Sequence, residues 1–240
     1  MRYAELREAA AEGNAALGKS GLVVLAFGNL SVADRRQRVM AIKPSGVAYE
    51  LIRPADIPVV DLDTGAVVEG STQPSTDTPT HRLLYNELPA IGGVVHTHST
   101  YATAWAQACR PIPCLGTTHA DHFRGAVPVT RQLRPAEIAE AYEEWTGRAI
   151  VELFQVDGRT ALDFPAVLVA SHGPFTWGAT GAEALEHAIA LERIAEIATH
   201  QAQLGELKEI DDALRERHFT RKRGPDAYYG QPAASAAGKG

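Results

Sequence analysis

The sequence predicts an α/β layered domain with a central sheet that is in large part antiparallel. Two observations predict it: short apolar strands joined by hairpin turns fill the first third of the chain, and helices separate the later strands. No polar linker divides the 240 residues, and we find no internal repeat. We therefore expect one domain over residues 1–231 and a disordered, small-residue tail over 232–240.

The individual elements follow from periodicity and turn residues. Apolar stretches bounded by Gly, Pro, Asn and Asp predict strands at 22–27, 30–32, 39–43, 59–60, 67–68, 93–98, 127–130 and 166–170. Apolar residues at helical spacing predict helices at 3–19, 78–88, 100–108, 135–146 and 182–204. The signal for the start of a helix is clearest at Thr78-Pro79, where we expect Thr78 as the N-cap and Pro79 as the first helical residue.

Composition excludes several classes of protein. The 23 Lys and Arg against 29 Asp and Glu give a net charge of −6, which does not favour general binding to nucleic acid or anionic membrane. Two cysteines, Cys109 and Cys114, are too few for a disulfide framework. The N-terminal segment lacks the apolar core of a signal peptide, and no apolar run approaches membrane-spanning length. We expect a cytoplasmic protein.

Three histidines form the strongest chemical signal. His96 and His98 are two apart in an expected strand, so both side chains point to one face. His172 follows another apolar strand, in Ser171-His172-Gly173. Three imidazoles with an open coordination position are typical of a zinc site that also binds substrate. A His-x-His pair alone also arises through packing or chance. We expect the remaining histidines not to be ligands: His81, His119, His122, His187, His200 and His218.

Three short segments share the chemistry of a phosphate site: Gly28-Asn29, Ser45-Gly46 and Ser75-Thr76. Glycine lets backbone N–H groups approach an anion, and the hydroxyls and amide add donors. Ser75-Thr76 also precedes an expected helix, whose N-terminus favours an anion. Each segment taken singly is better explained as an ordinary turn. Lys43 would add a positive charge, although a lysine at a strand end is commonly only solvated.

The order of these motifs resembles the class II aldolase and adducin-head family. The segments that carry the resemblance are 28–31, 42–47, 74–81, 93–99, 116–121, 171–175 and 227–231. They extend from just after the first expected helix to Gln231, and together they make coincidence negligible. The resemblance implies a single three-layer αβα domain, assembled as a cyclic homotetramer with a zinc ion in each active site, between neighbouring subunits. Manganese or cobalt would suit the same ligands.

The resemblance also assigns site residues. It implies that His96, His98 and His172 hold the metal, with Asp77 as a fourth or adjacent ligand. The family's phosphate-binding segments match Gly28, Asn29, Ser45, Gly46, Ser75 and Thr76. Thr76 departs from the common serine but keeps the hydroxyl, so we expect phosphate binding to be retained.

Within the family, the resemblance implies an epimerase that interconverts L-ribulose 5-phosphate and D-xylulose 5-phosphate. The reaction would cleave and re-form the C3–C4 bond, because the hydrogen on C4 is not acidic. Asp121 and Tyr229 match the two acid/base positions, with Tyr229 reaching in from the adjacent subunit. Each residue also has a non-catalytic interpretation: Asp121 as a helix or turn cap, and Tyr229 as half of an exposed aromatic pair in a tail. Thr117 and His218 are candidate substrate contacts.

Three other functions compete with this one. An aldolase of the same family would release a free aldehyde from a phosphorylated ketose, but such aldolases tend to carry glutamate at the position of Asp77. A non-catalytic interaction module would be expected to have lost metal ligands that this chain keeps. A purely structural zinc would make the fold itself depend on the metal.

Overall fold

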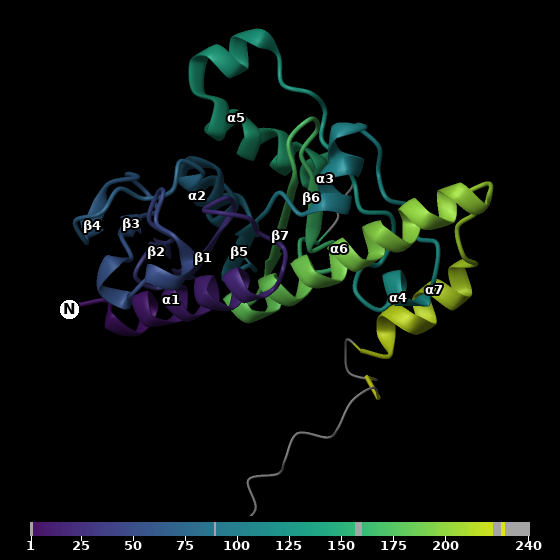
Figure 1. Ribbon diagram of the computed structural model, residues 1–240, viewed down its shortest axis with the longest axis horizontal. Helices are drawn as coiled ribbons and strands as arrows, with labels where there is room; N and C mark the ends of the chain where they lie inside the picture. The colour runs from purple at the N-terminus through teal and green to yellow at the C-terminus, as the bar shows by residue number, and fades with distance from the viewer. Residues whose placement is uncertain (1, 89, 157–159, 223–226, 229–240) are drawn as a thin grey trace, which may run out of the picture.

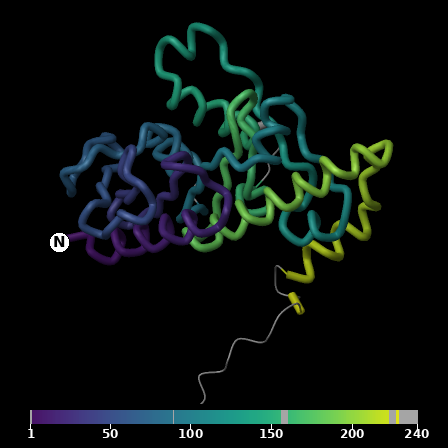
Figure 2. Tube along the Cα trace, in the orientation of Figure 1, coloured from purple at the N-terminus to yellow at the C-terminus, as the bar shows by residue number. Residues whose placement is uncertain are grey.

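The computed structural model describes residues 2–88, 90–156, 160–222 and 227–228. Two parts of the sequence predictions, the tail at 232–240 and Tyr229, lie outside the described residues. Figure 1 shows a layered α/β arrangement, and the tube of Figure 2 shows the same path of the chain from the N-terminus. No helix in the described part is long and apolar enough to cross a membrane.

The described strands form one sheet in the order β4-β3-β2-β1-β5-β7-β6, and every neighbouring pair is antiparallel. The strands are β1 (Asn29–Asp34), β2 (Val39–Ile42), β3 (Val59–Asp61), β4 (Val67–Glu69), β5 (Gly93–His96), β6 (Ala166–Leu168) and β7 (Pro174–Gly178). The antiparallel sheet predicted from the early hairpins is therefore confirmed.

Seven α-helices are described, together with two short 3-10 helices at Tyr49–Leu51 and Pro54–Asp56. The α-helices are α1 (Ala4–Lys19), α2 (Thr78–Glu87), α3 (Thr100–Gln107), α4 (Thr117–Ala120), α5 (Pro135–Val156), α6 (Gly181–Leu204) and α7 (Asp212–Thr220). Helix α5 is kinked, because Ala141 has non-helical dihedrals within it.

Alternation along the strands divides the core into two apolar layers. On one face, Val94 packs in a cluster with residues of α2 and α5, whereas its neighbour Val95 packs on the other face with residues of α1 and α6. Figure 1 shows α1 and α6 running along one side of the sheet and α5 on the other. Gly93 has no room for a side chain, because a Cβ there would lie 2.5 Å from the backbone of Gly181 in α6. The expected three layers are present.

Three local predictions are wrong. Residues 22–27 form a loop, in which Leu25 has φ +58° and is largely exposed, and they pair with none of the described strands. Residues 127–130 contribute only isolated bridges, to Ile112 and to Leu168. The N-cap of α2 is Asp77, and Thr78 is already helical, with its hydroxyl donating to the carbonyl of Ser75. Strand β7 was not predicted, although Phe175 and Trp177 alternate in it.

Candidate metal centre and substrate cavity

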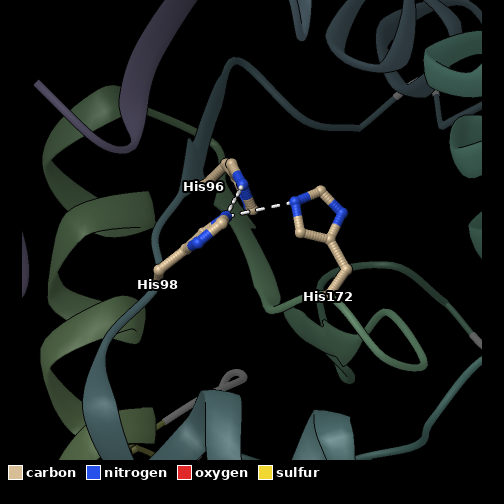
Figure 3. A group of neighbouring side chains, drawn as sticks. All are labelled: His96, His98 and His172. Carbon is tan, nitrogen blue, oxygen red and sulfur yellow. Dashed lines mark hydrogen bonds between the residues drawn. The ribbon is translucent and has the colours of Figure 1, made fainter.

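The pairing of β5 with β7 brings the three predicted histidines together. Strand β5 ends at His96, so His98 lies just beyond the strand and not within it as predicted. In the register of the pair, His96 lies opposite Phe175, and its ring stacks on that side chain. His172 lies in the turn that leads into β7. Figure 3 shows the three rings converging.

The facing nitrogen atoms are close enough to share one ion. The Nε2 atom of His98 lies 3.1 Å from Nε2 of His96 and 3.1 Å from Nε2 of His172. The three residues can offer ligand atoms that all lie within 4.8 Å of one another. Unprotonated nitrogens that face each other so closely are held favourably only by a proton or a cation between them. The donor set therefore fits a divalent metal such as zinc.

The electrostatics favour the neutral form of His96 and of His172. Burial, with a further contribution from His98, lowers the pKa of His96, and burial with the neighbouring His96 and His98 lowers the pKa of His172 to about 4. The Nδ1 atom of His96 lies 3.0 Å from the carbonyl oxygen of Pro174, to which it can donate, leaving the Nε2 lone pair for a metal. Neutral imidazoles are the form that binds a metal ion.

Asp77 lies beside the histidines. Burial opposes ionisation of Asp77, but His96, His81 and a hydrogen bond from Asn29 outweigh it, so the pKa of Asp77 is lowered. Its Oδ2 accepts from Nδ2 of Asn29 at 2.6 Å. Asp77 is outside the three-histidine group that can hold a metal. Its role as a ligand stays a prediction.

The three predicted phosphate segments meet in one cavity of about 300 Å³. Pro44 and Pro74 form a backbone bridge, and Ser75 N–H donates to the carbonyl of Lys43. Gly28 has φ +79°, and a Cβ there would lie 2.7 Å from the carbonyl of His96, so the close approach requires glycine. The cavity is lined by Ala26, Phe27, Gly28, Asn29, Lys43, Pro44, Ser45, Gly46, Ser75, Thr76, Asp77, His96, His98, Tyr142, Glu143 and His172.

Lys43 is the most informative member of this lining. Only 2% of it is exposed, so the expectation of an ordinary solvated strand-end lysine does not hold. Desolvation lowers the pKa of the Lys43 amine, which donates to the carbonyl of Pro44 at 3.3 Å and lies 5.0 Å from the centre of the Tyr49 ring. Within the described residues it forms no ion pair. A buried cation without a counterion, at the wall of a cavity, favours an anionic ligand there.

The remaining predicted residues lie elsewhere. Asp121, Thr117 and His218 do not line this cavity. Thr117 begins α4 and Asp121 follows that helix, while His218 belongs to α7. Asp121 Oδ1 accepts from Nε of Arg221 at 2.8 Å and lies 3.0 Å from Nδ1 of His218. Burial opposes ionisation of Asp121, but these contacts outweigh it and lower its pKa. Asp121 is thus a carboxylate at neutral pH.

Sequence reasoning missed five residues of the cavity, namely Ala26, Phe27, Pro44, Tyr142 and Glu143. Tyr142 and Glu143 enter it from α5 directly after the kink at Ala141, and Phe27 stacks against His98. The helical pattern of 135–146 gave no sign of the kink. Phe27 falls in the segment wrongly predicted as a strand, which hid its position in a loop.

The fold and the histidine site define a class of protein, and comparison with known proteins supports the same class. The family model for the class II aldolase and adducin N-terminal domain matches residues 8–199, and the chain belongs to this family. Class II aldolases generally depend on a divalent metal, and the histidine group can hold one.

Individual relatives are similar over nearly their whole length. The chain is 48% identical over 229 residues to L-ribulose-5-phosphate 4-epimerase UlaF of Salmonella paratyphi C, covering 95% of this chain and 99% of the relative. A solved L-fuculose 1-phosphate aldolase is 28% identical with a TM-score of 0.74, over 89% of this chain and 94% of that one. An L-fuculose 1-phosphate aldolase from Glaciozyma antarctica PI12, 19% identical with a TM-score of 0.73 over 94% of this chain and 84% of that one, shares the fold.

Replacing one converging histidine tests the site. We expect the purified protein, stripped with a chelator and reloaded, to bind about one divalent ion per chain, and His96→Asn to weaken binding by more than about 100-fold. His200→Asn is the matched control, because His200 belongs to α6 and lies outside the site, against Tyr101 of α3. Elemental analysis measures the number of ions per chain, and competition with a coloured chelator measures the affinity. Unchanged affinity in His96→Asn would contradict the assignment.

Proposed function

We propose that this chain is a metal-dependent epimerase that interconverts L-ribulose 5-phosphate and D-xylulose 5-phosphate. The observation that carries the proposal is the shared cavity, in which a three-histidine metal site faces a cradle for an anion. The 48% identity to a relative named for this reaction, across 99% of that relative, supports the choice of substrate.

The cradle would bind the phosphate of the substrate. Lys43 supplies a charge that burial leaves poorly solvated, and the N-terminus of α2 follows directly after Ser75 and Thr76. Asn29 is oriented by its bonds to Ser75 and Asp77. These groups act locally, so an anion can bind despite the net charge of −6. The phosphate end is thereby fixed relative to the histidines.

His96, His98 and His172 would hold the metal, for which we propose zinc, with Asp77 as a further or adjacent ligand. A divalent ion there supplies Lewis-acid stabilisation of negative charge that develops on substrate oxygens. Asp77 is shorter than the glutamate that the family's aldolases tend to carry, which favours a site where other groups move the protons. The aspartate at position 77 therefore favours the epimerase over an aldolase. The observation that supports an aldolase is the structural similarity to L-fuculose 1-phosphate aldolase.

Asp121 and Tyr229 would move the protons. Inversion at C4 needs a group on each face of the substrate: one removes the proton of the C4 hydroxyl, and the other returns it. Between these steps the C3–C4 bond breaks, the aldehyde fragment turns, and the bond re-forms on its other face. Asp121 suits this because its lowered pKa keeps it ionised. Thr117 and His218 would contact the substrate nearby.

Since Asp121 does not line the cavity of its own chain, we propose that it completes a neighbouring one. Asp121 contacts His218 of α7 and Arg221 directly after that helix, which ties it to the C-terminal part of the chain, and Tyr229 follows that part in the sequence. A cyclic homotetramer with active sites between subunits would bring this part to the partner's histidines. We further propose that residues 1–231 form the catalytic domain and that the enzyme works in the cytoplasm.

The direct test supplies L-ribulose 5-phosphate and follows D-xylulose 5-phosphate. We expect product that disappears when the metal is removed with a chelator and returns on addition of zinc, because the histidines need an ion to stabilise the developing charge. Circular dichroism of the metal-free protein is the control for a structural zinc. Release of a free aldehyde from related ketose phosphates, without epimerisation, would favour the aldolase.

Mixing two inactive variants tests the shared site. His96→Asn and Tyr229→Phe should each reduce turnover by at least about 100-fold. In co-expressed tetramers of both variants, about one quarter of the sites would pair an intact histidine group with an intact Tyr229 from the neighbour. Activity should recover to that level. Tyr228→Phe, at the adjacent exposed tyrosine, should keep near-normal turnover. Mixed tetramers no more active than their parents would argue against sites between subunits.

A further inference from the structure

Tyr142 lies against the outer nitrogen of a metal ligand. Its Oη atom is 3.1 Å from Nδ1 of His172, while Nε2 of the same ring faces His98 at 3.1 Å. The imidazole of His172 therefore has one nitrogen directed to the metal site and the other to a phenol. This contact was not anticipated from the sequence, and it is separate from the ligand set.

The same arrangement recurs at His96 with a different partner. There the outer Nδ1 meets the carbonyl oxygen of Pro174, which can only accept, and the Nε2 faces the site. A metal-binding imidazole needs its outer N–H held, because that hydrogen bond fixes which nitrogen carries the proton and how the ring is oriented. His172 has Tyr142 in the place that the carbonyl occupies at His96.

His172 also has more need of such a partner. His96 is buried and stacks on Phe175 with ring centres 4.2 Å apart, so packing already fixes its ring. His172 is half-buried and lies in a turn after Ser171, which has φ +61°. Its ring contacts His96, His98 and Tyr142 at the edge of the cavity.

The backbone of α5 presents Tyr142 in a defined position. Ala141 breaks the helix immediately before it, with φ −162° and ψ 76°, and this turns Tyr142 and Glu143 towards the cavity. The carbonyl of Glu143 accepts from the hydroxyl of Thr80 in α2, and the carbonyl of Tyr142 accepts from Thr146. The tyrosine is thus anchored on the helix layer opposite α6.

We propose that Tyr142 is a positioning residue for the metal centre: its Oη accepts the Nδ1–H of His172 and holds Nε2 towards the ion. The inference rests on the metal site of the proposed function, and it adds a group that binds neither the metal nor the phosphate. When Nε2 coordinates, the proton of the neutral ring is on Nδ1, so the phenol oxygen is the acceptor. Loss of that oxygen leaves the ring free to turn.

Tyr142→Phe removes only the oxygen and tests the proposal through metal binding, independently of turnover. We expect the dissociation constant for Zn²⁺, measured on the full chain by competition with a coloured chelator, to rise about 10–100-fold. The visible spectrum of the Co²⁺-loaded variant should also differ from that of the parent protein. Tyr101→Phe is the matched control, because Tyr101 also lies against a histidine, His200, outside the site. Its affinity should not change.

Three results would overturn the proposal, and they are distinguishable. Parent protein that binds no metal would overturn the proposed metal centre itself. Metal binding by the parent protein with equal affinity and an equal Co²⁺ spectrum in Tyr142→Phe would overturn only the role of Tyr142. A weaker affinity accompanied by a lower melting temperature of the metal-free variant would assign Tyr142 to general stability instead of positioning.

Discussion

The antiparallel pairing of β5 with β7 is the constraint on which the rest of the site depends. It places His96 opposite Phe175, so the turn into β7 carries His172 back to the end of β5. The same pairing supplies the carbonyl of Pro174 that holds the outer nitrogen of His96. The approach is close: a Cβ on Gly173 would lie 2.8 Å from the carbonyl of Thr97. One strand register thus brings His172 to His96 and His98, from which it is far apart in the sequence.

A second pairing places the anion cradle beside that centre. Strand β1 pairs with β5, and Asn29 lies opposite His96 in the register. The Pro44–Pro74 bridge then brings the segment after β2 against the start of α2. Lys43 is buried at this junction, and no carboxylate of the described residues forms an ion pair with it. A buried charge in this position costs stability unless an anion is present. This buried lysine lies at the wall of the cavity where we propose that a phosphate binds.

Sequence reasoning reached the layers and the group of three histidines because those depend on local patterns. Alternation at Val94 and Val95 and the spacing of His96 and His98 are visible in a few residues. It failed where tertiary contacts decide. Residues 22–27 are as apolar as a strand, yet they form a loop in which Leu25 takes a left-handed conformation. Tyr142 could not be found, because the kink at Ala141 has no proline or glycine to mark it. The burial of Lys43 likewise depends on segments distant in sequence.

The most direct measurement of the central claim is the epimerisation of L-ribulose 5-phosphate by the metal-loaded protein in D₂O. The proposed reaction cleaves the C3–C4 bond and moves only the proton of the C4 hydroxyl, so it leaves the hydrogen on C4 in place. Nuclear magnetic resonance of the D-xylulose 5-phosphate formed should therefore find no deuterium at C4. Deuterium at C4 would mean that a base removes that hydrogen directly, which would contradict this account of the site.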